Sequence, residues 1–205
     1  MAALQILPVN TESQQKRGKM KRKSISAHPF NTMCVQPLFL IGTYDDNGRA
    51  NFAPVTWLSK TYEGPDDLII ISLSGTKKTK NNIKKNGCLS ANLVSVDMLP
   101  LVDYLGSVSG CDGFKGKLEY AYSDGKIIKV PTLDASRWVY ELEVAQIVTI
   151  GDSDTFFCRI RNVQIDSSIA DTSDGVNLLE INPVIYSGHY HALGKHLGKI
   201  GDFLR

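Results

Sequence analysis

The sequence has few cysteines, and their spacing suggests no shared site. Cys34, Cys88, Cys111 and Cys158 are scattered over 205 residues without a C-x-x-C motif. Zinc cages need closely spaced ligands, and disulfide frameworks are typical of short, cysteine-rich secreted chains. The sequence therefore predicts neither a metal site nor a disulfide-stabilised fold.

Long apolar segments are also missing. The longest runs, such as residues 68–71, are far shorter than the about 20 residues that a membrane-spanning helix needs. No apolar segment follows the basic N-terminal residues, as a signal peptide would require. At 42% hydrophobic and 21% charged residues, the composition is that of an ordinary globular protein. We expect a soluble, cytoplasmic protein with no membrane partner.

Several catalytic and nucleotide-binding motifs are absent. The sequence lacks the G-x-x-x-x-G-K-[ST] pattern of nucleoside triphosphatases and the G-x-G-x-x-G pattern of dinucleotide-binding domains. No carboxylate pair, Ser-His-Asp set or activated cysteine stands out. We therefore expect no ATP or GTP site and no catalytic side chain.

The charges are distributed unevenly. A cluster near the N-terminus holds six of the 23 basic residues: Lys16, Arg17, Lys19, Lys21, Arg22 and Lys23. Outside it, 17 basic residues face 21 acidic ones, a formal balance of −4. Such a cluster can bind nucleic acid, but a solvated arm is commoner near a terminus. We interpret residues 1–24 as a basic, flexible arm, residues 25–205 as one domain, and nucleic acid as a partner we do not expect.

From about residue 35 onward, the sequence has the pattern of antiparallel strands. The apolar run 35–44 and the segment 49–59 flank "DDNG", a turn in which Asn and Gly tolerate positive φ. The Ile-rich run 67–75 predicts a strand covered on both faces. The segment 96–106 has a helical pattern, with Pro100 in the first turn and Gly106 at the end.

A long hairpin is predicted over residues 137–151 and 155–166. In the first strand, Trp138, Val144 and the even-numbered apolar residues between them lie on one face. Ile147 is odd-numbered, so the apolar positions have moved to the other face by this point. The second half changes parity between Ile160 and Val163. Such slips on paired strands indicate bulges, which let a sheet coil into a barrel. With few helical segments, the sequence predicts a mainly β protein, an antiparallel barrel with a few short helices.

A lysine-rich turn follows the strand 67–75. It carries Lys77 and Lys78 and leads to a short helix, for which Thr79 is a candidate N-cap and Gly87 a candidate C-cap. The free N–H groups and positive dipole end of such a helix form an anion pocket, to which Asn82 can add its amide. Taken alone, the lysines are explained equally well as the exposed side of a surface helix.

A set of motifs in a fixed order adds to this interpretation. They are "NFAPVTW" (51–57), "SLSGTKKTKNNI" (72–83), "CLSANL" (88–93), "SG" (109–110), the long hairpin, and "PVIYSGHYHALG" (183–194). In this order the sequence resembles the flavin reductase-like family of FMN-binding split barrels, over roughly residues 30–198. The resemblance implies a six-stranded antiparallel split barrel and a homodimer with FMN at or near its interface. It also implies an oxidoreductase that takes electrons from NAD(P)H as a transient donor.

The resemblance also assigns the cofactor-binding residues. The segment around Pro54 would follow the edge of the flavin ring, because a residue without an N–H turns the backbone away from normal strand pairing. Ala53 leaves room for a flat ring, and other residues hold the phosphate and ribityl groups. The complete set is Asn51, Ala53, Pro54, Val55, Thr56, Ser72, Lys78, Thr79, Asn82, Asn92 and Tyr190.

Two alternatives remain open at this point. His189 and His191 share a strand face, but no acidic or cysteine partner is near them in sequence, so we predict no metal site. The second alternative concerns turnover, because a non-catalytic FMN-binding or electron-carrier protein needs the same pocket as a reductase. The electron acceptor is not indicated by the sequence.

Overall fold

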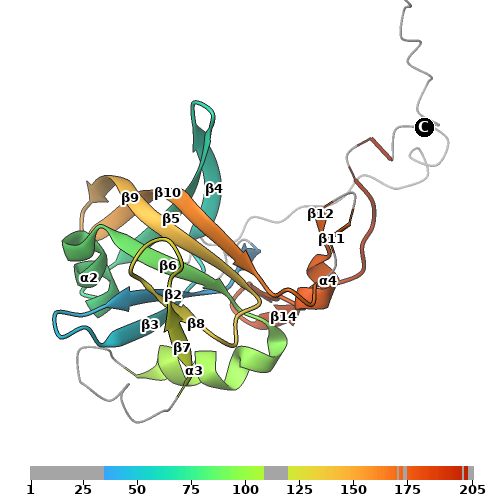
Figure 1. Ribbon diagram of the computed structural model, residues 1–205, viewed down its shortest axis with the longest axis horizontal. Coiled ribbons are helices and arrows are strands. Elements are labelled where there is room, and N and C mark those ends of the chain that lie inside the picture. Colours follow the sequence, from blue (N-terminus) through green and yellow to red (C-terminus); the bar gives the residue numbers. More distant parts are fainter. Residues whose placement is uncertain (1–34, 109–119, 170, 173–174, 200, 203–205) are drawn as a thin grey trace, which may run out of the picture. The chain divides into compact units, whose positions relative to one another are not determined.

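The structure is a computed structural model that describes residues 35–108, 120–169, 171–172, 175–199 and 201–202 (Figure 1). The chain divides into two units, Cys34–Gly194 and a second made of Met1–Met33 with Lys195–Arg205. The predicted basic arm lies outside the described residues. In the second unit, the Asp202 N–H donates to the Lys199 carbonyl over 3.2 Å and closes a turn. Within the described residues, no helix has the length and apolarity to cross a membrane.

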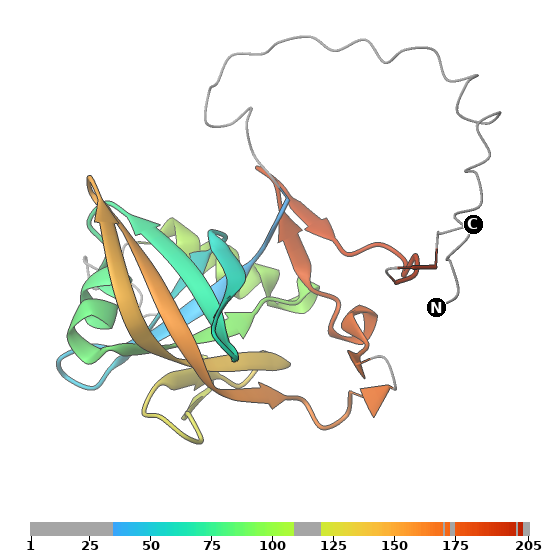
Figure 2. The same cartoon turned by 90° about the horizontal axis from the view of Figure 1, so that it is seen from above.

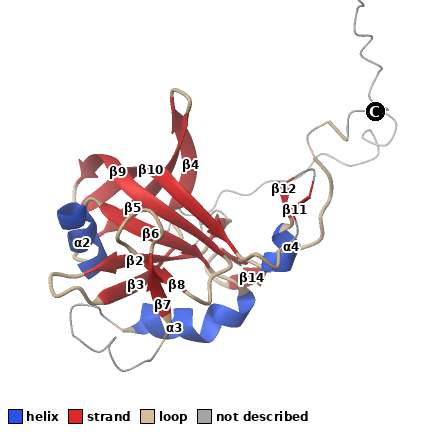
Figure 3. Cartoon of the chain, viewed as in Figure 1, coloured by secondary structure: helices blue, strands red, loops and turns tan. Residues whose placement is uncertain are grey.

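Seven antiparallel strands form the main sheet, in the order β3-β2-β6-β9-β10-β5-β4. Their bounds are Phe39–Tyr44 for β2, Ala50–Val55 for β3, Leu58–Glu63 for β4, Asp66–Ser74 for β5, Cys88–Leu93 for β6, Trp138–Ile150 for β9 and Ser153–Ile165 for β10. Figure 3 shows how far strands dominate the fold.

The sheet is curled on itself. Its two edge strands, β3 and β4, follow each other in the chain with only Thr56 and Trp57 between them. Two residues cannot connect the opposite edges of a flat seven-stranded sheet, because neighbouring strands are about 4.8 Å apart. Figures 1 and 2 show the strands curled around a common interior, and the barrel is split between β3 and β4, which do not pair with each other. The prediction of a mainly β split barrel is confirmed, whereas the main sheet has seven strands instead of six because β4 adds an edge hairpin to β5.

Smaller elements flank the barrel. A three-stranded sheet contains β1 (Gln36–Pro37), β13 (Val184–Tyr186) and β14 (Tyr190–Ala192); two pairs join β7 (Tyr122–Asp124) to β8 (Pro131–Leu133) and β11 (Asp171–Thr172) to β12 (Gly175–Val176). The helices are α2 (Lys78–Asn86), the 3-10 helix η2 (Val96–Met98), α3 (Leu99–Ser107) and α4 (Leu178–Ile181).

Local signals placed most element ends correctly. Gly87 caps α2 with a φ of 66°, and Pro100 lies in the first turn of α3, as predicted. Two assignments are wrong. The N-cap of α2 is Lys77, not Thr79, and α3 continues past Gly106 to Ser107, with Val108 as its C-cap. A glycine in a last helical turn ends the helix only if it adopts a left-handed conformation, and Gly106 does not have a positive φ.

Both predicted bulges are present in the β9–β10 hairpin. The pairing shifts between Phe157 and Cys158, which skips Ala145, and again between Ile160 and Asn162, which skips Arg161. These are the places where the parity of apolar residues changes in the sequence. An extra residue bends a strand and increases its twist, which is how this hairpin follows the curve of the barrel.

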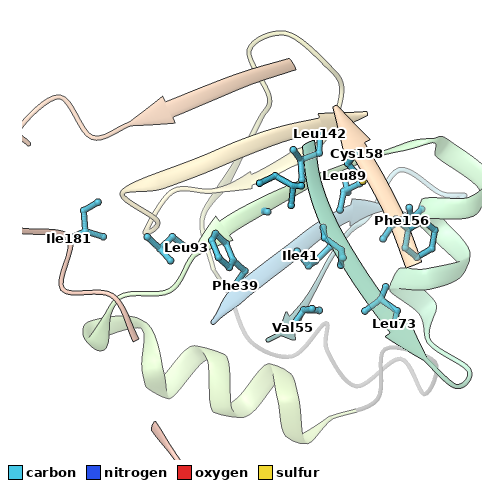
Figure 4. Close-up of a cluster of buried hydrophobic side chains, with 14 of the residues drawn as sticks. Phe39, Ile41, Val55, Leu73, Leu89, Leu93, Leu142, Phe156, Cys158 and Ile181 are labelled. Carbon is cyan, nitrogen blue, oxygen red and sulfur yellow. The ribbon is translucent and has the colours of Figure 1, made fainter. Parts of the chain in front are cut away.

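The core has two parts, which meet at β2. Phe39 and Ile41 face the barrel interior, which is filled by residues from all the main strands (Figure 4). Leu40 faces the other way, toward a second cluster that contains Phe52 and residues of α3 such as Val102. Burial of one such side chain contributes about 1.5–3 kcal/mol. Helix α3 is therefore fixed against the barrel wall that includes β3.

The outer face of β5 is less covered than its sequence predicts. Ile69, Ile71 and Leu73 are buried, whereas Ile70 and Ser72 on the other face are only partly buried. The expectation of a strand covered on both faces is therefore wrong for the single chain. Cross-strand neighbours of this face come from β10 and β9, where Phe157 pairs with Ile70.

Candidate functional site

A cavity of about 320 Å³ lies at the split of the barrel, beside edge strand β3. Four segments line it: Asn51 and residues 53–55 of β3, Leu73 of β5, residues 76–79 at the start of α2, and residues 105–108 at the end of α3. Two of these segments are the proline-containing strand and the lysine-rich turn that the sequence singled out. The fold brings them to one site.

Pro54 lies on an edge strand and against a helix. Within the described residues, β3 pairs only with β2, so the other side of its backbone has no strand partner. A proline is tolerated there because its missing N–H is not needed for the ladder. A Cβ on Gly106 would lie 3.1 Å from Pro54 Cγ. The absence of a side chain at Gly106 is therefore what lets α3 approach this wall of the cavity.

The N-terminus of α2 opens into the cavity without a cap. Lys77, the N-cap residue, has extended backbone angles and makes no side-chain capping hydrogen bond, and the first turn contains no acidic residue. The first N–H groups of a helix have no partner within the helix, and the helix dipole makes them attractive to anions. This helix end therefore presents a positive potential to the cavity, with Thr76 and Lys77 beside it.

A buried polar network connects β2, β3 and α2. The Asn51 amide donates to Thr79 Oγ1 over 2.9 Å and to Thr43 Oγ1 over 3.5 Å, and Asn82 Nδ2 donates to Thr43 Oγ1 over 3.0 Å. All four side chains are buried. The Thr79 hydroxyl oxygen therefore accepts a hydrogen bond from strand β3 instead of capping the helix. Its O–H can still donate a hydrogen bond.

Four of the five lysines in the turn and helix pair with carboxylates. Lys78 pairs with Asp45 over 3.0 Å, Lys80 and Lys84 approach Asp154 at 3.7 and 3.0 Å, and Lys85 pairs with Asp46 at 2.5 Å. Among the described residues, Lys77 has no such partner. The exposed-helix explanation of the lysines is therefore incomplete, because four of them fix α2 to neighbouring hairpins and the fifth lines the cavity.

Asp45 is the most strongly held of these carboxylates. Its side chain is 7% exposed, and burial by itself would raise its pKa. Hydrogen bonds from the Arg49 and Asn47 N–H groups and from the Lys78 ammonium outweigh that effect and hold the pKa of Asp45 well below its usual range. Asp45 is therefore a fixed negative charge at the base of the lysine-rich turn.

The cavity gathers six of the eleven predicted site residues and not the other five. It is lined by Asn51, Ala53, Pro54, Val55, Lys78 and Thr79, but not by Thr56, Ser72, Asn82, Asn92 and Tyr190. Asn82 lies behind it in the polar network. Ser72 lies on the outer barrel face, where its hydroxyl is 2.8 Å from that of Thr155.

The other three residues are engaged elsewhere. Asn92 is fully buried; its amide donates to the Leu40 carbonyl and Ser90 Oγ, and its Oδ1 accepts from the Leu133 N–H. The Thr56 carbonyl accepts from the Leu58 N–H at the corner between β3 and β4. The Tyr190 hydroxyl donates to Asp103 of α3 over 3.2 Å. In the single chain none of these three residues lines the cavity, and the Asn92 and Tyr190 side chains have structural contacts elsewhere.

Sequence analysis missed part of the lining. Lys77 lines the cavity and immediately precedes Lys78 in the same motif. Recognising Lys77 as the N-cap of the helix would have separated its role from that of Lys78. Leu73 and the end of α3 carried no signal, because their approach to β3 depends on the tertiary fold. Among the described residues, no three His, Cys, Asp or Glu side chains are grouped as metal ligands would be.

Comparison with protein families identifies the domain. The model of the flavin reductase like domain matches residues 32–194, most of the chain. The chain belongs to the flavin reductase-like family. This match includes every segment that lines the cavity. A search of the curated proteins finds no match to this flavin reductase-like chain.

Solved structures share the fold. Flavoredoxin of Desulfovibrio vulgaris is 26% identical, with a TM-score of 0.80 over 90% of this chain and 100% of that one. Flavoredoxin from Methanosarcina acetivorans is 18% identical, with a TM-score of 0.76 over 89% of this chain and 97% of that one. An FMN-binding protein from Thermus thermophilus, solved with bound p-hydroxybenzaldehyde, is 23% identical, with a TM-score of 0.69 over 89% and 99%. The last two likenesses concern the fold alone.

Proposed function

We propose that this flavin reductase-like protein binds FMN in the cavity at the barrel split and uses it as an oxidoreductase. Electrons come from NADH or NADPH and pass to free flavin, a ferric complex or an electron-transfer partner. One observation carries the proposal: edge strand β3 and the uncapped N-terminus of α2 line the same cavity, together with Lys77, which has no carboxylate partner among the described residues. These are the two ends that a phosphorylated, planar ligand requires.

The phosphate end would be the start of α2. The free N–H groups there and the Thr79 hydroxyl are hydrogen-bond donors for phosphate oxygens, and Lys77 supplies a positive charge. Lys78 is a weaker phosphate ligand than its sequence position implies, because its ammonium already pairs with Asp45. We therefore propose that Lys77, instead of Lys78, is the main cation that binds the phosphate.

The ring end would be the wall made by β3. Ala53 and Pro54 present little side-chain bulk, and Gly106 behind them presents none. Asn51 has an amide oxygen that can accept a hydrogen bond from a ligand. Val55, Leu73, Leu105 and Val108 are apolar and exclude water from the cavity. A volume of about 320 Å³ is at the lower end for small-ligand sites, which suits a mononucleotide better than a dinucleotide.

The chain's residues bind and orient, and they do not supply acid–base catalysis. FMN, when bound, supplies the hydride and electron chemistry. Polar groups at the two ends of the cavity fix the orientation of the ligand, and the apolar side chains keep water from its reactive face. The sequence has no dinucleotide-binding motif, so NAD(P)H would approach as a transient visitor. The 26% identical structure is a flavoredoxin, which agrees with this assignment.

We also propose that the protein acts as a homodimer. On the outer barrel face, three cross-strand rows carry no formal charge: Ile70, Phe157 and Gln146; Ser72, Thr155 and Val148; Ser74, Ser153 and Ile150. Exposed Trp57 adjoins these rows, next to Ser72. A face without formal charge can meet its own copy across a two-fold axis without like-charge repulsion. A second copy would cover the face of β5 that the single chain leaves open.

The first experiment is to purify the protein, record its visible spectrum, and identify any cofactor released on denaturation. We expect a flavin spectrum and FMN, while colourless protein that does not bind added FMN contradicts the assignment. Steady-state oxidation of NADH and NADPH with added flavin or ferric acceptors then tests turnover. A rate no higher than the protein-free background favours the second candidate, a non-catalytic electron carrier with the same FMN site.

A further inference from the structure

We propose that Asp45 determines how strongly this protein holds the phosphate of its ligand, because it neutralises Lys78 and leaves Lys77 as the uncompensated cation of the site. The inference rests on the proposed function, since it assumes that a phosphorylated flavin occupies the cavity. It adds a specificity-determining residue that does not itself line the cavity.

The position of Asp45 is fixed by its own turn. It lies directly after β2, and its carboxylate accepts hydrogen bonds from the N–H groups of Asn47 and Arg49, both over 2.9 Å. The side chain is nearly buried, and the Arg49 guanidinium approaches it at 3.1 Å from the solvent side. The carboxylate therefore has little freedom to move away from Lys78.

Lys78 is the cavity residue that pairs with Asp45, whose carboxylate it shares with Arg49. It is the first residue of α2, it lines the cavity, and its Nζ donates to Asp45 Oδ2 over 3.0 Å. Its side chain is only 28% exposed, so the pair is less screened by solvent than a surface ion pair. Without Asp45, the start of α2 would present two unpaired lysines to an anion instead of one.

The consequence concerns selectivity for the phosphorylated ligand. FMN and riboflavin share the same ring and ribityl chain, but only FMN carries the phosphate. The ratio of their dissociation constants therefore measures the strength of the phosphate site, independently of any change at the ring end. A change in fold stability alone alters both affinities together and leaves this ratio unchanged.

The test uses Asp45→Asn in the full-length protein, with flavin binding followed by fluorescence quenching. Asparagine keeps an oxygen that can accept the turn hydrogen bonds, and it is favoured in such turns. We expect FMN to bind about fivefold more tightly and riboflavin to be unaffected, with the gain reduced at high salt, as is typical of one screened charge. Asp46→Asn is the matched control. Asp46 lies in the same turn and the substitution removes the same charge, but its partner Lys85 is in the last turn of α2, away from the cavity lining. Asp46→Asn should leave the ratio of the FMN and riboflavin dissociation constants unchanged.

Two further variants complete the test. Asp45→Asn combined with Lys78→Met should return the ratio to the wild-type value, because both members of the compensated pair are removed. An unchanged or lower preference for FMN in Asp45→Asn overturns the role of Asp45. If Lys77→Met lowers that preference while Asp45→Asn has no effect, the proposed phosphate site stands and only this inference fails. If neither variant changes the ratio, the phosphate site itself is wrong.

Discussion

The side-chain amide of Asn51 donates a hydrogen bond to the hydroxyl of Thr79 over 2.9 Å. Asn51 is on edge strand β3 and Thr79 is in the first turn of α2, with 27 residues between them in the chain. Both side chains are buried and both line the cavity. This bond makes the wall proposed for the ring and the helix end proposed for the phosphate parts of one rigid site.

Replacing Thr79 by Val tests this connection. Valine has nearly the same shape but no hydroxyl, so the buried Asn51 amide loses its acceptor at a cost of about 1–3 kcal/mol. We expect a lower melting temperature and weaker binding of FMN, measured by thermal denaturation and flavin titration. Thr79→Ser keeps the hydroxyl and should retain most of both properties. A loss in Thr79→Ser with none in Thr79→Val would mean that the methyl group, and not the hydrogen bond, matters.

Lys77→Met tests the assignment of the phosphate cation. Its charge is uncompensated among the described residues, so its removal should weaken FMN about tenfold, the size expected for a charge-assisted contact, and leave riboflavin unchanged. Lys85→Met is the control, because it removes the same charge from the far end of α2. Titration of each variant with FMN and with riboflavin gives the ratio of the two dissociation constants. A similar ratio change in both variants indicates a general charge effect instead of a specific site.

Gly106→Ala tests the close approach of α3 to Pro54. The new Cβ would lie 3.1 Å from Pro54 Cγ, so the cavity wall must shift by a few tenths of an ångström. Alanine gains roughly 1 kcal/mol in helix propensity, which offsets part of the strain, so we expect a nearly unchanged melting temperature. FMN and riboflavin should both weaken by about fivefold. In a Pro54→Ala background, which lacks the contacted Cγ, the same substitution should have no effect on either affinity.

Glu141→Gln tests a buried anion that organises the barrel far from the cavity lining. Glu141 is fully buried on β9 and accepts hydrogen bonds from the N–H groups of residues 126–128 and from the amides of Asn162 and Gln164. Burial alone would raise the pKa of Glu141, but these donors lower it. A glutamine would place its own NH₂ against donors, so we expect a loss of unfolding free energy on the order of 2–4 kcal/mol. Denaturant unfolding measures it.

The control for this variant is Glu143→Gln, two residues further along β9. The Glu143 side chain is 51% exposed and lies 3.6 Å from Arg161. An exposed pair contributes about 1 kcal/mol or less, so this change should have little effect. Similar losses in the two variants would contradict the special role of Glu141.

Asp45 predicts a dependence of stability on pH. Its pKa is lowered in the folded state relative to the unfolded value of about 3.9, so its contribution is complete above that value and is lost as the pH falls toward the folded-state pKa. At pH 7, Asp45→Asn should therefore melt roughly 2–4 °C below wild type, for about 1 kcal/mol. At pH 2–3 the difference should shrink. A difference that stays constant across this range would mean that the charge of Asp45 does not stabilise the fold.

Local patterns in the sequence were sufficient for the strands and their irregularities. The changes of parity near Val144 and Ile160 located both bulges, because alternation depends only on which residues face the core. The "DDNG" turn and the Gly87 cap were equally local, since each depends on the φ of one or two residues. The predicted cap at Thr79 failed because a donor from β3, the Asn51 amide, bonds to that hydroxyl oxygen, and no local rule includes this competitor.

The sequence by itself determined that the chain forms an antiparallel barrel with a short helix after a lysine-rich turn, because side-chain periodicity and turn chemistry act within a few residues of each other. Only the tertiary structure decided which lysine has no carboxylate partner in the described part of the chain, which of the predicted residues face the cavity, and that α3 completes its wall. Those outcomes depend on contacts such as Lys78 with Asp45 and Pro54 with Gly106, between residues 33 and 52 positions apart. Contacts at such separations arise from chain packing, which the alternation of apolar residues does not encode.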